Sequence, residues 1–211
     1  MIRVHVVVVG EKVYVGGGFN NARKVFQYNW RGDTWSTLPH CPVKWFGMAH
    51  FMGRIITVGG VDLQYSPTGK VHALREESQQ WEEFLTPMPT ARCGLSVATT
   101  STAIIAAGGD TGAIAYSSAV EVYSSDTSQW HTADPLPIPC AWMSSVIINN
   151  VCYLLGGASG SDLIKDCWHI FGSTAACLSG SLLAIGGRND DHTRSSAVYA
   201  FLNNSWVRLR N

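Results

Sequence analysis

The stretch Ile56-Thr57-Val58-Gly59-Gly60 decides the fold, because this apolar run closed by two glycines returns along the whole chain. Four further runs end in the same way, at Gly16-Gly17, Gly108-Gly109, Gly156-Gly157 and Gly186-Gly187. From one second glycine to the next, the steps are 43, 49, 48 and 30 residues. Self-similarity at a nearly fixed period indicates a repeat architecture, so we expect an array of five similar units.

Two other features keep the same phase. The residue seven before each second glycine is glycine or asparagine in four of five units, which suits a tight hairpin turn: Gly10, Gly53, Asn150 and Gly180, with Thr102 as the exception. In four units a tyrosine or leucine precedes a tryptophan by seven residues: Tyr28 and Trp35, Leu74 and Trp81, Tyr123 and Trp130, Tyr199 and Trp206. Each unit is therefore predicted to be four strands, with a long loop after the double glycine.

The residue types also predict where each strand lies. Small residues two apart precede each turn, as in Gly47 and Ala49, and they suit an innermost strand crowded around an axis. The strand that ends in the double glycine is almost wholly apolar, which is expected of a strand covered on both faces. No long segment has the helical period, so the sequence predicts an all-β protein.

The order double glycine, tyrosine, tryptophan resembles the kelch repeat. Leu38-Pro39, Met88-Pro89 and Leu136-Pro137 resemble the usual leader of that family into the next unit. The resemblance implies one β-propeller domain over residues 1–211, with four-stranded blades at about 1–38, 39–87, 88–135, 136–171 and 172–211. The rival repeat with a Trp-Asp signature is disfavoured, because none of the eight tryptophans is followed by aspartate.

The fourth unit departs from the pattern. Trp168 stands in the tyrosine position and lies 19 residues before Gly187, whereas Tyr28 lies 32 residues before Gly60. About one outer strand is missing, so this blade is predicted to have three strands and an exposed Trp168. Either the blade evolved shorter, or the chain is a splice variant or a defective gene product. Five units also fall short of the six or seven blades usual for the family, and no strand overlap is predicted to latch the ring.

The sequence gives little support for catalysis or for the binding of nucleic acid or a membrane. Fifteen basic and fifteen acidic residues cancel, which gives no reason to expect nucleic acid or a membrane as partner. Six scattered cysteines form no C-x-x-C pair, so neither a metal site, a cofactor nor a structural disulfide is predicted, and a reducing, cytoplasmic location fits. The seven histidines occupy unrelated points of the repeat, and no catalytic group is assigned.

The remaining candidate is the face that carries the long loops. Loops on a rigid scaffold are where binding concentrates, and tryptophan and arginine are enriched in binding hot spots. Burial at a blade junction is the alternative for Trp45 and Trp142. The predicted protein-binding residues are Asn20, Arg23, Trp45, Tyr65, Arg92, Asp110, Tyr116, Trp142, Asp162, Arg188 and Asp190.

The sequence thus predicts a non-catalytic module that binds another protein through the loop face, as the kelch resemblance implies. One alternative is a propeller enzyme or sugar-binding protein with a site at the mouth of the axis. Another is a truncated isoform without function. A ubiquitin-ligase adaptor role requires further domains outside this chain.

Overall fold

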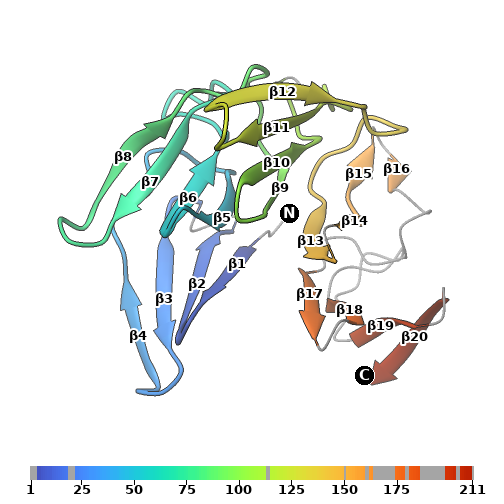
Figure 1. The fold of residues 1–211 in the computed structure, drawn as a ribbon, viewed down its shortest axis with the longest axis horizontal. Helices are drawn as coiled ribbons and strands as arrows, with labels where there is room; N and C mark the ends of the chain where they lie inside the picture. The colour runs from blue at the N-terminus through green and yellow to red at the C-terminus, as the bar shows by residue number, and fades with distance from the viewer. Residues whose placement is uncertain are drawn as a thin grey trace.

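The computed structural model describes residues 4–18, 22–112, 115–149 and 151–159. It also describes the backbone of the later strands, over residues 162–163, 174–178, 181–185, 198–202 and 205–210. All regular structure in these residues is β-strand, and the sheets stand around a common centre (Figure 1).

Four antiparallel sheets have four strands each, in the order of the chain. Blade 1 comprises β1 (Val4–Val9), β2 (Lys12–Gly17), β3 (Val25–Asn29) and β4 (Thr34–Thr37). Blade 2 comprises β5 (Gly47–Phe51), β6 (Arg54–Val58), β7 (Val71–Arg75) and β8 (Gln80–Leu85). Blade 3 comprises β9 (Ser96–Thr99), β10 (Ala103–Ala107), β11 (Val120–Ser124) and β12 (Gln129–Ala133). Blade 5 comprises β17 (Thr174–Leu178), β18 (Ser181–Ile185), β19 (Val198–Leu202) and β20 (Ser205–Arg210).

Blade 4 differs from the others in its described part. Its inner hairpin consists of β13 (Ser144–Ile148) and β14 (Val151–Leu155). A separate small hairpin, β15 (Ala158–Ser159) with β16 (Asp162–Leu163), follows the double glycine. The predicted third strand, the exposure of Trp168 and the missing outer strand lie outside the described residues.

The innermost strands contact one another in chain order, β1 with β5, β5 with β9, β9 with β13 and β13 with β17. The first and last of them, β1 and β17, are also in contact. Each four-stranded sheet is built from consecutive strands, so no described strand from one end of the chain joins a sheet from the other end.

The hydrophobic core is divided among the gaps between blades. We call the side of a blade that meets the next blade in the chain its forward face, and the opposite side its rear face. Tyr14 and Val25 of blade 1 pack with Ile55 and Leu74 of blade 2, all at most 3% exposed. Ile56 on the forward face of blade 2 packs in the same way into a cluster with blade 3. Alternate residues of β6 therefore serve two different interfaces, as expected of a strand that is covered on both faces.

The tyrosine and tryptophan columns meet across the two outer strands. Tyr28 pairs with Trp35, Leu74 with Trp81 and Tyr123 with Trp130. In blade 5 the register instead places Trp206 opposite Phe201. Leu202 pairs with Ser205, so the connection between β19 and β20 is two residues shorter than in blades 1 to 3, and the seven-residue spacing there does not correspond to a cross-strand pair.

The structure also corrects the phase of the first repeat. Positive φ angles occur at both glycines of Gly59-Gly60, Gly108-Gly109 and Gly156-Gly157, and in blade 1 they occur at Gly17 and Gly18. Gly16 is instead an ordinary strand residue that pairs with His5. A triple glycine leaves this one-residue choice open in the sequence.

Candidate partner-binding site on the loop face

Three equivalent residues turn the chain into the innermost strands with left-handed backbone. They are Trp45, Gly94 and Trp142, with φ of +54°, +59° and +64°. Each follows a residue that bridges to the start of a long loop: Lys44 to Val61, Cys93 to Asp110 and Ala141 to Ala158. The repeat therefore brings these three positions to the loop face.

Backbone hydrogen bonds join the three positions around the axis. The amide of Gly94 donates to the carbonyl of Trp45 at 2.8 Å, and the amide of Trp142 donates to the carbonyl of Gly94 at 2.7 Å. Positive φ suits glycine, whereas in a bulky residue it is uncommon and costs about 1–3 kcal/mol. The neighbouring blades hold Trp45 and Trp142 in this conformation.

The two tryptophans form an aromatic cluster, defined here as Lys44, Trp45, Tyr65 and Trp142. The ring centroids of Trp45 and Tyr65 are 5.8 Å apart, and those of Trp45 and Trp142 are 6.4 Å apart and nearly perpendicular. The Lys44 ammonium lies 3.7 Å from the centroid of the Tyr65 ring, a cation–π contact. Tyr65 is 61% exposed, and both tryptophans are half-buried. The cluster is thus an aromatic surface with one positive charge.

Two residues outside the cluster hold its rings in place. The carboxylate of Asp62 accepts hydrogen bonds from the amides of Gln64 and Ser66, both at 2.9 Å, and so fixes the loop that carries Tyr65. Gly94 leaves room for the Trp142 ring, because a Cβ there would lie 2.8 Å from three of its carbon atoms. Neither role was predicted from the sequence, and neither was the part that Lys44 plays. The signal for Gly94 was its place two residues before the small residue of the innermost strand, as in Trp45 and Trp142.

The other predicted residues fall into two groups: some form contacts within the protein, and some lie outside the residues whose side chains the structure describes. Arg23 is half-buried, and its Nε donates to the Cys41 carbonyl at 2.6 Å. Asp110 accepts a hydrogen bond from the Gly112 amide and bridges through its backbone to Tyr116, so both shape the loop of blade 3. Asp162 is described only as backbone of β16. Asn20, Arg188 and Asp190 lie outside the described residues.

Arg92 requires a correction, because its side chain is fully buried and cannot meet a partner on the surface. Its guanidinium pairs with Glu121 and donates to the carbonyls of Thr90, Ala106 and Gly108. Burial lowers the pKa of Arg92, and Glu121 opposes this shift. Arg92 therefore joins the crossover into blade 3 to strands β10 and β11.

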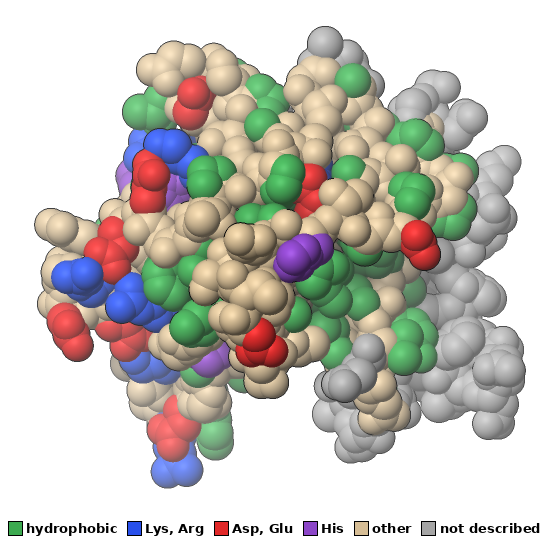
Figure 2. Space-filling view, turned by 45° about the horizontal axis from the view of Figure 1, so that its top comes forward, with side chains coloured by type: hydrophobic (Ala, Val, Ile, Leu, Met, Phe, Trp, Pro, Cys, Tyr) green, Lys and Arg blue, Asp and Glu red, His purple; other side chains and the backbone are tan. Residues whose placement is uncertain are grey.

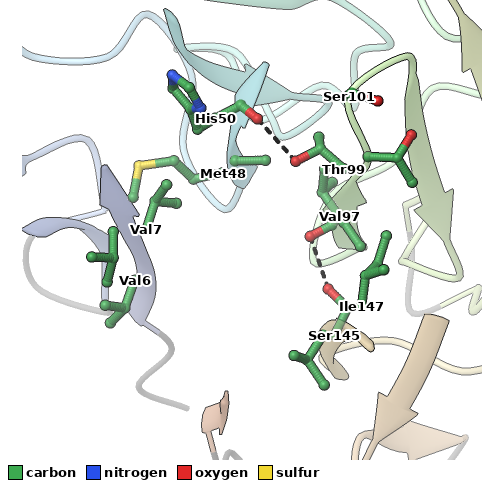
Figure 3. A pocket seen from close by; sticks show the side chains of 14 residues that line it. Val6, Val7, Met48, His50, Val97, Thr99, Ser101, Ser145 and Ile147 are labelled. Carbon is green, nitrogen blue, oxygen red and sulfur yellow. Dashed lines mark hydrogen bonds between the residues drawn. The ribbon is translucent and has the colours of Figure 1, made fainter. Parts of the chain in front are cut away.

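The alternative site, at the axis, is a cavity of about 460 Å³ between β1, β5, β9 and β13. Figure 3 shows its lining, in which Thr99 donates to the His50 carbonyl and Ser145 to the Val97 carbonyl. Among the described residues that line the cavity, one is a histidine and none is a carboxylate. Among the described residues no group of three or more His, Cys, Asp or Glu is placed to hold a metal ion.

In the described part, charges of both signs are mixed over blade 2, and thiol chemistry adds no further site. Figure 2 shows acidic and basic side chains interspersed over blade 2, where Arg75 pairs with Glu82 and Lys70 with Glu83. Burial raises the pKa of the Cys41 thiol to about 11, and burial together with Asp110 raises that of Cys93 to about 12. Both thiols thus stay protonated near neutral pH and are poor nucleophiles. No helix in the described residues could cross a membrane.

Comparison with known proteins agrees with this architecture. The family model described as "Kelch motif" matches residues 3–42 and 91–137. The Kelch-like protein terF of Aspergillus terreus is 26% identical over 72% of this chain and 36% of its own length. Kelch-like protein 35 of mouse is 23% identical over 90% of this chain and 35% of its own length. Beta-scruin of Limulus polyphemus is 24% identical over 93% of this chain and 21% of its own length. The chain thus spans about a third of the first two relatives and a fifth of the third.

A solved structure, that of YjhT, superposes with a TM-score of 0.75 at 16% identity, covering 99% of this chain and 83% of that one. At this identity the likeness shows the fold alone. Taken with the five double glycines and the four-stranded blades, these matches show that the chain carries kelch motifs and is similar to kelch-repeat proteins.

Proposed function

We propose that this chain is a non-catalytic module that binds a partner protein through the aromatic cluster on its loop face. The supporting observation is that two tryptophans occupy left-handed backbone positions where Gly94, in the blade between them, is unstrained. Bulky residues kept in a costly conformation, with their rings partly exposed, are typical of functional sites rather than of cores. Exposed tryptophan and tyrosine are also the side chains enriched in binding hot spots.

The names of the Kelch-like relatives are consistent with an interaction protein, and they identify no partner for this chain. A ubiquitin-ligase adaptor role belongs to the proposal only where further domains accompany this one. A cytoplasmic place of action is likewise part of the proposal, and the protonated, buried thiols of Cys41 and Cys93 suit a reducing compartment.

The test replaces each strained tryptophan with the residue that its backbone prefers. In Trp45→Gly and Trp142→Gly the backbone strain is relieved while the ring is lost, so we expect a small change in melting temperature and the loss of partner capture. Gly94→Ala should also weaken capture, because the new Cβ displaces the Trp142 ring. Capture is measured by quantitative mass spectrometry of co-purified proteins and then by titration with the purified partner.

Met52→Gly is the matched control. Met52 is 59% exposed and has a φ of +49°, and it lies in the β5–β6 turn at the opposite end of the blade. Its loss should leave capture unchanged. A partner retained by Trp45→Gly and Trp142→Gly but lost in Met52→Gly would refute a site on the loop face.

The axial cavity supports an enzyme or a sugar-binding protein less well. An acid–base mechanism needs two groups that exchange protons with the substrate, and the described residues that line the cavity include one histidine, His50, and no carboxylate.

A further inference from the structure

A second pocket, of about 380 Å³, lies against blade 2 beside the loop that carries Tyr65. Its lining includes Val43, which precedes the aromatic cluster in the chain, and Asp62 of the loop, together with Lys70, His72, Trp81 and Glu83 on or next to β7 and β8. We call it the side pocket. It shares no described lining residue with the axial cavity, and its volume is in the range of pockets that bind small groups.

Strand register brings three of these side chains to one surface. His72 of β7 pairs with Glu83 of β8, and Trp81 lies two residues before Glu83, so all three side chains point to the same side of the sheet. This side is the rear face of blade 2, because Leu74, the partner of Trp81, packs there against blade 1. The Trp81 Nε1 donates to the Pro39 carbonyl at 2.9 Å, so only the carbon atoms of the indole are left to the pocket.

The inner end of the side pocket holds a polar atom without a partner. His72 is 4% exposed, and its Nδ1 makes no hydrogen bond within the described part of the chain. Burial lowers the pKa of the His72 imidazole, so the ring is neutral at pH 7 and one of its nitrogens is an acceptor. An unpaired buried polar atom destabilises the fold, and a ligand that donates to Nδ1, in the tautomer protonated at Nε2, would remove that cost.

The outer end carries more negative than positive charge. The Glu83 carboxylate pairs with the Lys70 ammonium, and both side chains are exposed. Asp62 accepts the amides of Gln64 and Ser66 through Oδ1, whereas its Oδ2 accepts no hydrogen bond from the described residues. With a neutral imidazole, two carboxylates and one ammonium give the side pocket a net charge of −1.

The groups left free in the side pocket are acceptors, and this selects the ligand. The oxygens of Asp62 and Glu83 and the Nδ1 of His72 can all accept, and the carbon surface of an indole attracts cations. No three His, Cys, Asp or Glu in the described residues are placed to hold a metal ion, which favours an organic cation. A guanidinium is flat and carries five N–H donors, so it can serve several acceptors at once, whereas an ammonium is a point charge.

We propose that the side pocket binds the guanidinium of an arginine side chain. The arginine belongs to the partner that binds the aromatic cluster, a step that rests on the proposed function. The two sites adjoin, because Asp62 shapes the loop that carries Tyr65, and Val43 precedes Lys44 in the chain. A partner seated on the aromatic cluster therefore has the side pocket within reach of one of its side chains.

The test titrates the full chain with N-acetyl-arginine methylamide, a probe whose guanidinium is its only charge. Binding is followed through the NMR signal of the His72 ring, which is assigned by its absence in His72→Gln. We expect a saturable shift of this signal. N-acetyl-citrulline methylamide, which has the same shape without the charge, should bind roughly tenfold more weakly, because hydrogen bonds from charged donors are the stronger kind.

Charge variants test the sign of the recognition. Asp62→Asn and Glu83→Gln should each weaken binding of the arginine probe severalfold, and the asparagine keeps an oxygen for the two loop amides. Lys70→Gln should strengthen binding, because it removes the cation that competes for Glu83. Glu82→Gln is the matched control, since Glu82 lies on the other face of the same strand and pairs with Arg75, and it should leave binding unchanged.

Weaker binding of the arginine probe to Lys70→Gln would overturn the proposal, and so would equal binding of the arginine and citrulline probes. Free arginine, with its α-ammonium and α-carboxylate, should bind no better than the capped form. Much tighter binding of free arginine would assign the side pocket to the amino acid itself, and the proposal of a protein side chain would be wrong.

Capture of the partner completes the test. We expect Glu83→Gln to weaken capture, and full capture by this variant would refute the partner's arginine as the ligand. The probe titrations need no partner, so their outcome does not depend on the proposed function. Loss of capture in Trp45→Gly with no binding of the probe would refute the side pocket alone.

Discussion

At the scale of single residues, the buried pair of Arg92 and Glu121 shows the largest departure from what residue type suggests. An arginine in a crossover next to loops is ordinarily a surface group. Here Glu121 lies 29 residues further along the chain and also accepts hydrogen bonds from the amide and hydroxyl of Thr90. Every charged atom of the pair has a partner, which is the condition under which a buried ion pair is tolerated.

Arg92→Ala is expected to lower the free energy of unfolding by about 3–5 kcal/mol, because it leaves the Glu121 carboxylate buried without its partner. The double variant Arg92→Met with Glu121→Leu should recover most of that loss, since it removes both charges together. Chemical denaturation of the three proteins measures the effect. A loss of capture without a loss of stability in Arg92→Ala would mean that this side chain is at the surface after all.

The buried side chain of His72 is expected to make the stability of the fold depend on pH. It is 4% exposed, and its Nδ1 has no hydrogen-bond partner among the described residues. Burial lowers its pKa from the ordinary 6.5; Lys70 adds to this shift and Glu83 opposes it. The unfolded chain therefore binds the proton more readily than the folded one, and the contribution to stability is present above pH 6.5 and lost as the pH falls below it.

The free energy of unfolding should accordingly decline between pH 7.5 and pH 5, about the range in which histidine titrates. The decline should be shallower in His72→Gln, whose amide does not titrate. Urea titrations across this range give the slope. An identical slope in both proteins would assign the acid dependence to other groups.

At the scale of elements, the close approach of the innermost strands β5 and β9 depends on one glycine. A Cβ on Gly47 of β5 would lie 2.2 Å from Cγ2 of Val97 on β9. The small residue that the sequence places there thus allows two blades to approach at the axis. The close packing of this strand could be predicted from the sequence, because small residues at alternate positions indicate that one face of the strand lies against a near neighbour.

Gly47→Ala is expected to cost about 1–3 kcal/mol of stability through overpacking. Val97→Ala should relieve most of this cost, because it removes the methyl group that the new Cβ meets. Gly10→Ala serves as the control, since nothing lies within 4 Å of that Cβ and only its φ of +56° opposes the change. Thermal unfolding should show rescue by Val97→Ala for Gly47→Ala alone.

At the scale of the whole molecule, residues at the same position of the repeat contribute differently to stability, because the residues packed against them differ. Trp130 packs against the cluster between blades 2 and 3, and its Nε1 donates to the Thr86 carbonyl at 2.8 Å. Trp35 holds the same place in blade 1 and is largely exposed.

Trp130→Ala is therefore expected to destabilise the fold by about 3–5 kcal/mol, and Trp35→Ala by less than about 1 kcal/mol. Differential scanning calorimetry of the two variants measures the contrast. Equal losses would mean that blade 1 is covered in solution as blade 3 is.

The same contrast explains how far the sequence could predict this protein. Repeat spacing identifies Tyr28, Trp35 and the glycine pairs, because local patterns determine strands and turns. It does not reveal that the Trp35 side chain is largely exposed, because the burial of this side chain depends on contacts with a different blade. Nor does it reveal that Trp142 reaches across Gly94 to Trp45, because that contact joins residues 97 positions apart. Long-range contacts were predicted where the repeat dictates them and missed where one blade departs from its neighbours.

The perpendicular indoles of Trp45 and Trp142 have an optical consequence. Two indole chromophores with ring centroids 6.4 Å apart and ring planes at 81° are close enough for their electronic transitions to couple, so we expect a paired band of opposite signs in the ultraviolet circular dichroism. The amplitude depends on the angle between the rings, so a molecule that settles on the loop face changes the signal as it tilts either one. The protein thereby carries a label-free reporter of occupancy at the place where we expect its partner.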